Sequence, residues 1–213
     1  MGRESDRILR APIIFAHEKL GLTPNQISLI GFMLGMAAAA LVAARLLLPG
    51  LIVLAVSQIA DGLDGGVARR YNLQSPAGRM LEVVYDRLSE CAVFFALAFT
   101  GYATYTMAVL AFIAILLVTM MEPYSGFDPG FKRFIIYFGY AAMMLFGIRG
   151  FQAAMQVIFF ANLSAFVVGG VIAEYRLQKE IDRQAILRRD RELAEGIPQP
   201  PGDPPSFLSG LFS

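Results

Sequence analysis

The chain has 213 residues, of which 56% are hydrophobic and 16% are charged. A soluble domain carries roughly 25% charged residues, so this composition, with a mean hydropathy of +0.57, excludes an ordinary soluble protein and indicates a single-domain integral membrane protein. The net charge of +1 gives no reason to expect nucleic-acid binding.

The first predicted element is an interfacial amphipathic helix within residues 1–22. Its segment DRILRAPIIFAHEKLGL mixes basic and apolar residues, which is typical of a helix that lies in the membrane interface. The next residues predict the start of a second helix. Thr23 can cap it, Pro24 suits its first position, and Gln26 completes a capping box.

Long runs without charge predict the membrane-spanning helices. They cover residues 27–44, 46–60, 91–121, 134–148 and 150–173. A spanning helix needs about 20 apolar residues, so the run 91–121 is too long for one span and is divided at Thr100 and Gly101. We therefore predict an all-α integral membrane protein with six transmembrane helices in a domain of residues 23–175, preceded by the interfacial helix. The predicted spans lie at about 25–48, 51–70, 79–100, 103–121, 132–148 and 151–175.

Residues 176–213 form the last predicted segment. RLQKEIDRQAILRRDREL alternates charge sign, which is typical of a solvated helical extension, and PQPPGDPP predicts a disordered tail. With six spans, the Lys and Arg residues gather on one side of the membrane, and only Arg45 and Arg149 fall on the other. The positive-inside rule therefore predicts a protein of the cell (cytoplasmic) membrane with both termini in the cytoplasm.

Four carboxylates interrupt the second and third predicted spans. Asp61 and Asp64 are three residues apart, and Glu82 and Asp86 are four apart, so each pair lies on one helix face. Charges at membrane depth need a partner or a water-filled cavity, and two divalent cations would neutralise these four. No His or Cys accompanies them, which favours Mg²⁺ or Mn²⁺ over zinc. A proton or cation relay in a transporter explains the charges alone equally well.

The spacing of the charged segment is Asp61-x2-Asp64-Gly65-x2-Ala68-Arg69-x8-Gly78-x3-Glu82-x3-Asp86. It resembles the signature of the CDP-alcohol phosphotransferase (CDP-alcohol phosphatidyltransferase) family. The six predicted spans and the amphipathic N-terminal helix extend the resemblance over residues 1–175. The resemblance implies a transferase of phospholipid biosynthesis. It would move the phosphatidyl-type group of CDP-diacylglycerol or a related CDP-lipid to an alcohol acceptor and release CMP.

The resemblance also implies a role for each residue of the motif. Two divalent cations, Mg²⁺ or Mn²⁺, would be held by Asp61, Asp64, Glu82 and Asp86. Asp86 would also be the catalytic base toward the acceptor hydroxyl. The CDP or CMP group would be bound by Gly65, Ala68, Arg69 and Gly78. Membrane lipid would surround the protein, and members of this family commonly form homodimers.

Two departures from the family pattern leave alternatives open. The third family Asp is Glu82 here, and its extra methylene would move one metal by about an ångström. A non-catalytic paralogue that binds CDP-lipid is therefore an alternative, beside the cation-coupled transporter. The second departure is MMEPYSGFDPGFKR, which replaces a Tyr-x-Arg-Ala-type segment of many members and leaves the small alcohol or alcohol-phosphate acceptor open.

Three further charged residues have two interpretations each. Lys132 and Arg133 stand at the start of the fifth predicted span, on the same side as the carboxylates. They are either positive-inside anchors or ligands of a phosphate on the acceptor. Glu90 continues the stripe of Glu82 and Asp86 by one more helical turn. It either pairs with Arg87 or bonds to the second helix, and a structural role is expected.

Overall fold

The structure is a computed structural model, and it describes residues 9–127 and 134–194. All regular elements in these two ranges are helices, which confirms the predicted all-α class. A short segment, α2 (Arg10–Ile14) followed by the π-helix η1 (Phe15–Lys19), precedes the long helices. The long helices are α3 (Pro24–Ala43), α4 (Leu47–Arg70), α5 (Pro76–Phe99), α6 (Tyr105–Ser125), α7 (Phe134–Phe146) and α8 (Ile148–Ala194).

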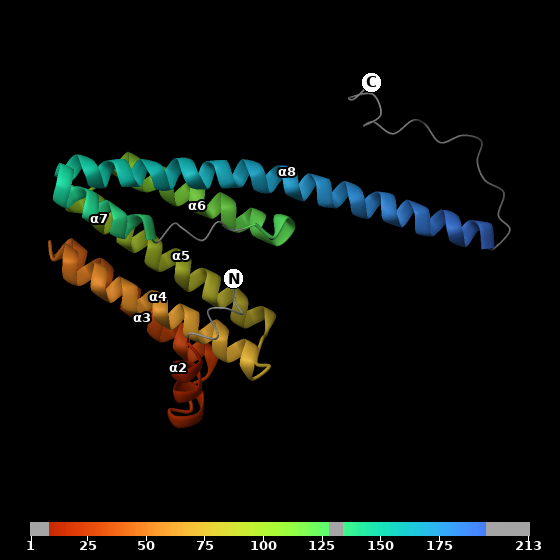
Figure 1. Cartoon of the computed structure of the whole chain (residues 1–213), viewed down its shortest axis with the longest axis horizontal. Coiled ribbons are helices and arrows are strands. Elements are labelled where there is room, and N and C mark those ends of the chain that lie inside the picture. Colours follow the sequence, from red (N-terminus) through yellow and green to blue (C-terminus); the bar gives the residue numbers. More distant parts are fainter. Residues whose placement is uncertain (1–8, 128–133, 195–213) are drawn as a thin grey trace, which may run out of the picture.

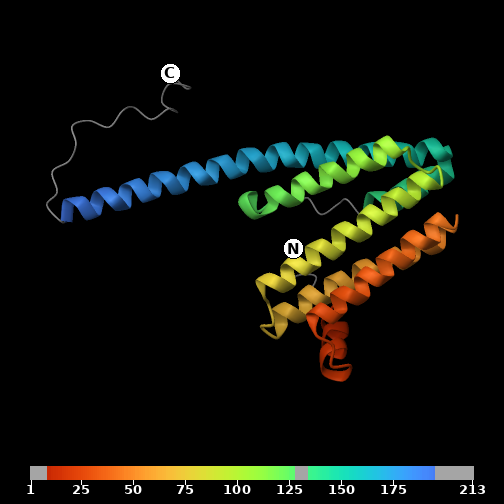
Figure 2. The ribbon, with the colours of Figure 1, turned by 180° about the vertical axis from the view of Figure 1, so that it is seen from behind.

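The long helices form two groups that meet at α5. Helix α3 packs against α4 and α5, and α8 packs against α6 and α7. Helix α5 also contacts α6 and so joins the two groups (Figure 1). Seen from behind, α2 projects from the end of the first group, and α8 runs on past the other helices (Figure 2). Residues 174–191 of α8 are exposed along their whole length.

The helix ends follow local signals in the sequence. Thr23 caps α3 in the predicted capping box, with side-chain and backbone hydrogen bonds between Thr23 and Gln26. Helix α3 ends at Ala43, earlier than predicted, because Arg45 adopts a positive φ of 65° that no helix can contain. Helix α5 begins at Pro76, earlier than the predicted residue 79, because the Ser75 hydroxyl accepts the backbone N–H of Gly78 at 3.0 Å.

The six predicted spans are all present as helices, but these helices differ in length and in hydropathy. Four helices of the described ranges are long and apolar enough to cross a membrane, namely α3, α4, α6 and α8. The charged residues of the predicted site lower the hydropathy of α5, and the 13 described residues of α7 are shorter than a full span. Helix α8 continues without a break across residue 175, where the predicted transmembrane domain ends.

The described part of the N-terminal segment packs against the start of α3 and the second half of α4. Ile13 and Ala16 are buried in a small apolar cluster with residues of α3 and α4. Beside it, the Tyr71 hydroxyl donates a hydrogen bond to Glu18 at 2.7 Å. This bond to a carboxylate raises the pKa of Tyr71, so the phenol stays protonated and keeps donating. Residues 1–8 of the predicted interfacial segment lie outside the described ranges.

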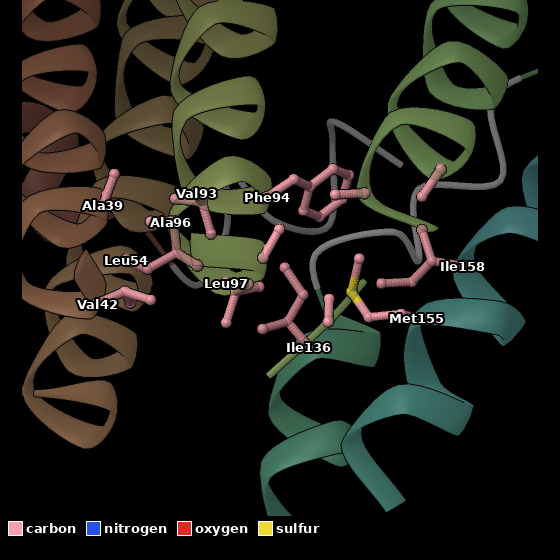
Figure 3. Packing of buried hydrophobic residues seen from close by; sticks show 14 of the residues in the cluster. Ala39, Val42, Leu54, Val93, Phe94, Ala96, Leu97, Ile136, Met155 and Ile158 are labelled. Carbon is pink, nitrogen blue, oxygen red and sulfur yellow. The ribbon is translucent and has the colours of Figure 1, made fainter. Parts of the chain in front are cut away.

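A larger apolar cluster holds the two groups of helices together. Figure 3 shows Leu97 and Phe94 of α5 reaching toward Ile136 of α7 and Met155 of α8. Many of its members are alanines. In lipid the hydrophobic effect does not drive helices together, so their association depends on close packing, and small side chains allow the helix backbones to approach closely. The cluster fixes the position of α5, the helix that carries two of the four predicted metal ligands.

We expect the Gly150→Ala substitution to destabilise the turn between α7 and α8. A Cβ atom at residue 150 would lie 2.4 Å from the backbone carbonyl oxygen of Ala142, so one helix must move. Overpacking of this kind costs about 1–3 kcal/mol, and we expect a lower melting temperature of the purified protein in detergent.

Gly170→Ala is the matched control, because a Cβ at this position of the same helix meets no atom within 4 Å. Replacing this glycine should leave the melting temperature unchanged or raise it. Equal melting temperatures for the Gly150 variant and the wild type would contradict the close packing of α7 on α8.

Candidate active site

The site begins with contacts that place α4 against α3. Ser57 of α4 donates a hydrogen bond to the backbone carbonyl of Gly31 at 2.8 Å. Asp61, one turn later, lies against the same glycine, because a Cβ built there would be 2.8 Å from Asp61 Oδ1. The absence of a side chain at residue 31 therefore lets the Asp61 carboxylate reach the interface between α3 and α4.

Asp64 is the most enclosed of the four predicted metal ligands. Its side chain is buried, with 3% relative exposure, and accepts hydrogen bonds from the Ser28 hydroxyl and from the backbone N–H of Gly65. Glu82 and Asp61 are both close enough to Asp64 to repel it electrostatically. Asp61 and Glu82 therefore both lie within electrostatic range of Asp64.

An open cavity of about 670 Å³ lies next to Asp64. It is bounded by the start of α3, the end of α4, the turn at residues 71–75 and the start of α5. All four predicted donor-binding residues line it, and so do two predicted metal ligands. These lining residues are Gly65, Ala68, Arg69 and Gly78 with Asp64 and Glu82. Residues predicted as one motif therefore share one cavity.

Two glycines keep this cavity open. A Cβ at Gly78 would lie 2.9 Å from Ser75 Oγ and 3.0 Å from Asn25 Oδ1, so a side chain would press on the cap of α5. A Cβ at Gly65 would lie 3.0 Å from the Arg69 guanidinium, which folds back along α4. Arg69 thus places a cation on the wall of the cavity that Asp64 and Glu82 also line, and a guanidinium is a strong hydrogen-bond donor to phosphate.

The other two predicted ligands, Asp61 and Asp86, are less buried than Asp64. Asp61 contacts Gly31, and Asp86 lies 3.7 Å from the Arg87 guanidinium; neither is among the cavity-lining residues. Within residues 9–127 and 134–194, no three His, Cys, Asp or Glu side chains are gathered closely enough to hold one metal ion. Asp64 accepts a hydrogen bond from Ser28, and Asp86 lies against Arg87.

The residues still suit hard divalent cations by their chemistry. Every predicted ligand offers carboxylate oxygens, and Ser28 adds a hydroxyl next to Asp64. Asp64 and Glu82 face the same cavity from two different helices.

Several residues of the site were not singled out in the sequence. Ser28 follows the capping box by two residues, but nothing local indicates that it meets Asp64, 36 positions away. Arg79 lines the cavity and pairs with Glu122 of α6 at 3.4 Å. The sequence feature that could have indicated Arg79 is its position directly after Gly78 of the motif. The predicted acceptor residues Lys132 and Arg133 lie outside the described ranges.

Comparison with known proteins gives a family match. A family model described as CDP-alcohol phosphatidyltransferase matches residues 21–161. The chain is 35% identical over 101 residues to the archaetidylinositol phosphate synthase of Pyrococcus horikoshii, covering 47% of this chain and 53% of that protein. It is also 36% identical over 85 residues to the inner membrane protein YnjF of Escherichia coli, covering 40% and 38%. The chain thus spans about half the length of these curated relatives or less.

Solved structures share the fold. The phosphatidylinositol phosphate synthase PgsA1 of Mycobacterium tuberculosis, crystallised with manganese and citrate, has a TM-score of 0.64 and 18% identity, covering 76% of this chain and 87% of that chain. The same enzyme with CDP-DAG bound gives a TM-score of 0.63 and 18% identity, covering 80% and 94%. At this identity the similarity establishes the helical arrangement.

Proposed function

The chain belongs to the CDP-alcohol phosphatidyltransferase family, and on that premise we propose that it transfers the phosphatidyl-type group of a CDP-lipid to an alcohol with release of CMP. The observation that carries the proposal is the cavity beside Asp64. Its wall combines the predicted nucleotide-binding residues with two predicted metal ligands. An arginine beside carboxylates suits a diphosphate bridged by cations, whereas a cation path through a transporter has no need of Arg69.

Two divalent cations, Mg²⁺ or Mn²⁺, would be held by Asp61, Asp64, Glu82 and Asp86. When bound, they supply positive charge that stabilises the developing charge on the departing CMP. This part of the proposal is supported by the all-oxygen donor set and by the manganese bound in a crystal structure of the same fold. CDP-diacylglycerol as donor is supported by the CDP-DAG bound to that same enzyme.

The chain's own residues divide the work of the transfer. Arg69 orients the diphosphate, and the small residues Gly65, Ala68 and Gly78 leave room for the nucleotide along the helix backbones. Asp86 accepts the proton of the acceptor hydroxyl. The acceptor oxygen then forms a bond to the lipid-side phosphorus, and the bond from that phosphorus to the CMP oxygen breaks.

We place the catalytic domain at residues 23–175, with six spans and both termini in the cytoplasm of a cell-membrane protein. The distribution of Lys and Arg supports this orientation. The names of the archaetidylinositol phosphate synthases support an alcohol phosphate as acceptor, with Lys132 and Arg133 as its candidate ligands. The chain would act as a homodimer, as relatives of this family commonly do.

The decisive experiment measures CMP release by the purified protein in lipid nanodiscs. The donor is CDP-diacylglycerol, and the acceptors are glycerol phosphate, inositol phosphate, serine and a simple amino alcohol, with lipid products identified by mass spectrometry. We expect product only with Mg²⁺ or Mn²⁺, complete loss with EDTA, and recovery on metal addition, because four carboxylates at membrane depth need added positive charge.

Three outcomes would contradict parts of the proposal. Full turnover in EDTA would exclude the metal site. Donor binding without CMP release for every acceptor would identify a CDP-lipid-binding paralogue. Ion-driven uptake into vesicles that is independent of CDP-lipid would identify a transporter.

A further inference from the structure

Arg87 of α5 lies between two carboxylates of its own helix. One guanidinium nitrogen, Nη1, is 3.0 Å from Glu90 Oε2, and Nη2 is 3.2 Å from Glu90 Oε1. The same Nη2 is 3.7 Å from Asp86 Oδ2. Arg87 therefore makes a two-pronged contact with Glu90 and a longer one with Asp86.

A second helix holds the guanidinium in this position. Arg87 Nη1 donates a hydrogen bond to Thr119 Oγ1 of α6 at 3.1 Å, and that hydroxyl donates to the Ile115 carbonyl at 2.9 Å. The side chains of Arg87 and Glu90 are only 13% and 8% exposed. The guanidinium is thus held in an enclosed place by one hydrogen bond to Glu90, a close ion-pair contact to the other Glu90 oxygen, and one hydrogen bond to Thr119.

Asp86 has a function that a fully paired arginine would impair. In the proposed reaction its carboxylate holds a cation and takes a proton, and a guanidinium in full contact would compete for the same oxygens. We infer that Glu90 holds Arg87 away from full contact with Asp86 and so keeps that carboxylate available to a divalent cation.

The inference rests on the proposed function of Asp86 and makes Arg87 and Glu90 positioning residues that act through it. A merely structural salt bridge would not predict that neutralising Glu90 alone weakens metal binding and that neutralising Arg87 as well restores it. With Glu90 neutralised, Arg87 turns to Asp86 and metal binding weakens. With Arg87 also neutralised, the competitor is gone and metal binding recovers.

The test measures Mn²⁺ binding to the purified full-length chain in nanodiscs, without substrate, by electron paramagnetic resonance of free Mn²⁺. We expect Glu90→Gln to raise the Kd for Mn²⁺ about tenfold, the effect of one charged hydrogen bond. The double variant with Arg87→Gln should return to the wild-type Kd. Glu180→Gln is the matched control, because Glu180 pairs with Arg183 at the same three-residue spacing on the exposed part of α8.

The inference is overturned if Glu90→Gln leaves the Kd unchanged, or if the double variant binds Mn²⁺ as weakly as Glu90→Gln. It is also overturned if the wild type binds no Mn²⁺. Should Glu90→Gln not fold, Thr119→Val tests the same point with both charges kept, and we expect a rise of about threefold, the effect of one neutral hydrogen bond. An unchanged Kd for that variant overturns the inference too. CMP release is measured separately, so a wild type that shows the Glu90 effect but no CMP release supports this inference and refutes the proposed reaction.

Discussion

The Asp86→Asn variant is expected to bind CDP-lipid but to release CMP about 10²–10⁴-fold more slowly than the wild type, the usual contribution of a general base. The amide keeps the size and shape of the carboxylate, but it cannot take the acceptor's proton, and it removes one of the four proposed metal ligands. Asp86 is partly buried on α5, beside the Arg87 guanidinium, so the substitution changes charge without opening a void. The measurement is CMP release at saturating donor and acceptor, together with donor binding.

Asp61→Asn provides the contrast for this prediction. Asp61 lies against Gly31 on the other side of the site and has no proposed proton-transfer role. Its substitution should weaken Mn²⁺ and donor binding together with turnover. Near-normal turnover of Asp86→Asn would show that Asp86 is not the base.

Substitutions of Glu82 should distinguish two cases. In one, Glu82 serves as a metal ligand in place of the family Asp; in the other, the change to Glu has made the site inactive. Glu82 lines the same cavity as Asp64, from a different helix. Glu82→Gln removes one anionic ligand, and we expect at least about a hundredfold loss of CMP release, the scale of a misplaced reacting group. Glu82→Asp restores the family residue and should retain activity. Both are measured as CMP release over a range of Mn²⁺ concentrations.

The exposed Glu180→Gln substitution on α8 controls for the loss of one negative charge and should leave turnover unchanged. A decayed site would give a different pattern: the wild type would bind CDP-lipid without releasing CMP, and Glu82→Asp would restore turnover. If Glu82→Ala keeps both the rate and the metal dependence of the wild type, Glu82 is not a ligand. Its charge would then be an unexplained cost at membrane depth.

The positions of the helices could be predicted because membrane helices are long apolar runs with local start signals. Thr23 and Pro24 indicated the start of α3, and the structure confirms the capping box of Thr23 with Gln26. Ser75 and Pro76 carry the same kind of signal, and they begin α5 three residues before the predicted start. The end of α3 was less predictable, because a positive φ at Arg45 depends on how the turn packs.

Four of the cavity-lining residues could be predicted because the motif resembles the signature of a known family. The resemblance implies that Gly65, Arg69 and Gly78 bind one CDP group, and the structure places all three on one cavity. Contacts between distant segments had no such signal. The bond from Ser28 to Asp64 and the bond from Arg87 to Thr119 both depend on how α3 and α6 pack against their neighbours. The pairing of Arg87 with Glu90, predicted as one of two alternatives, is confirmed.

The unbroken course of α8 has a mechanical consequence. The helix is packed in the bundle at its first half and exposed from residue 174 to residue 191, with no break between these parts. At a rise of 1.5 Å per residue, the exposed part is an arm of about 25 Å. Such an arm works as a lever: a tilt of about 5° in the packed half displaces its far end by about 2 Å. A small change in the tilt of the packed half would therefore move the exposed end further than the packed half itself.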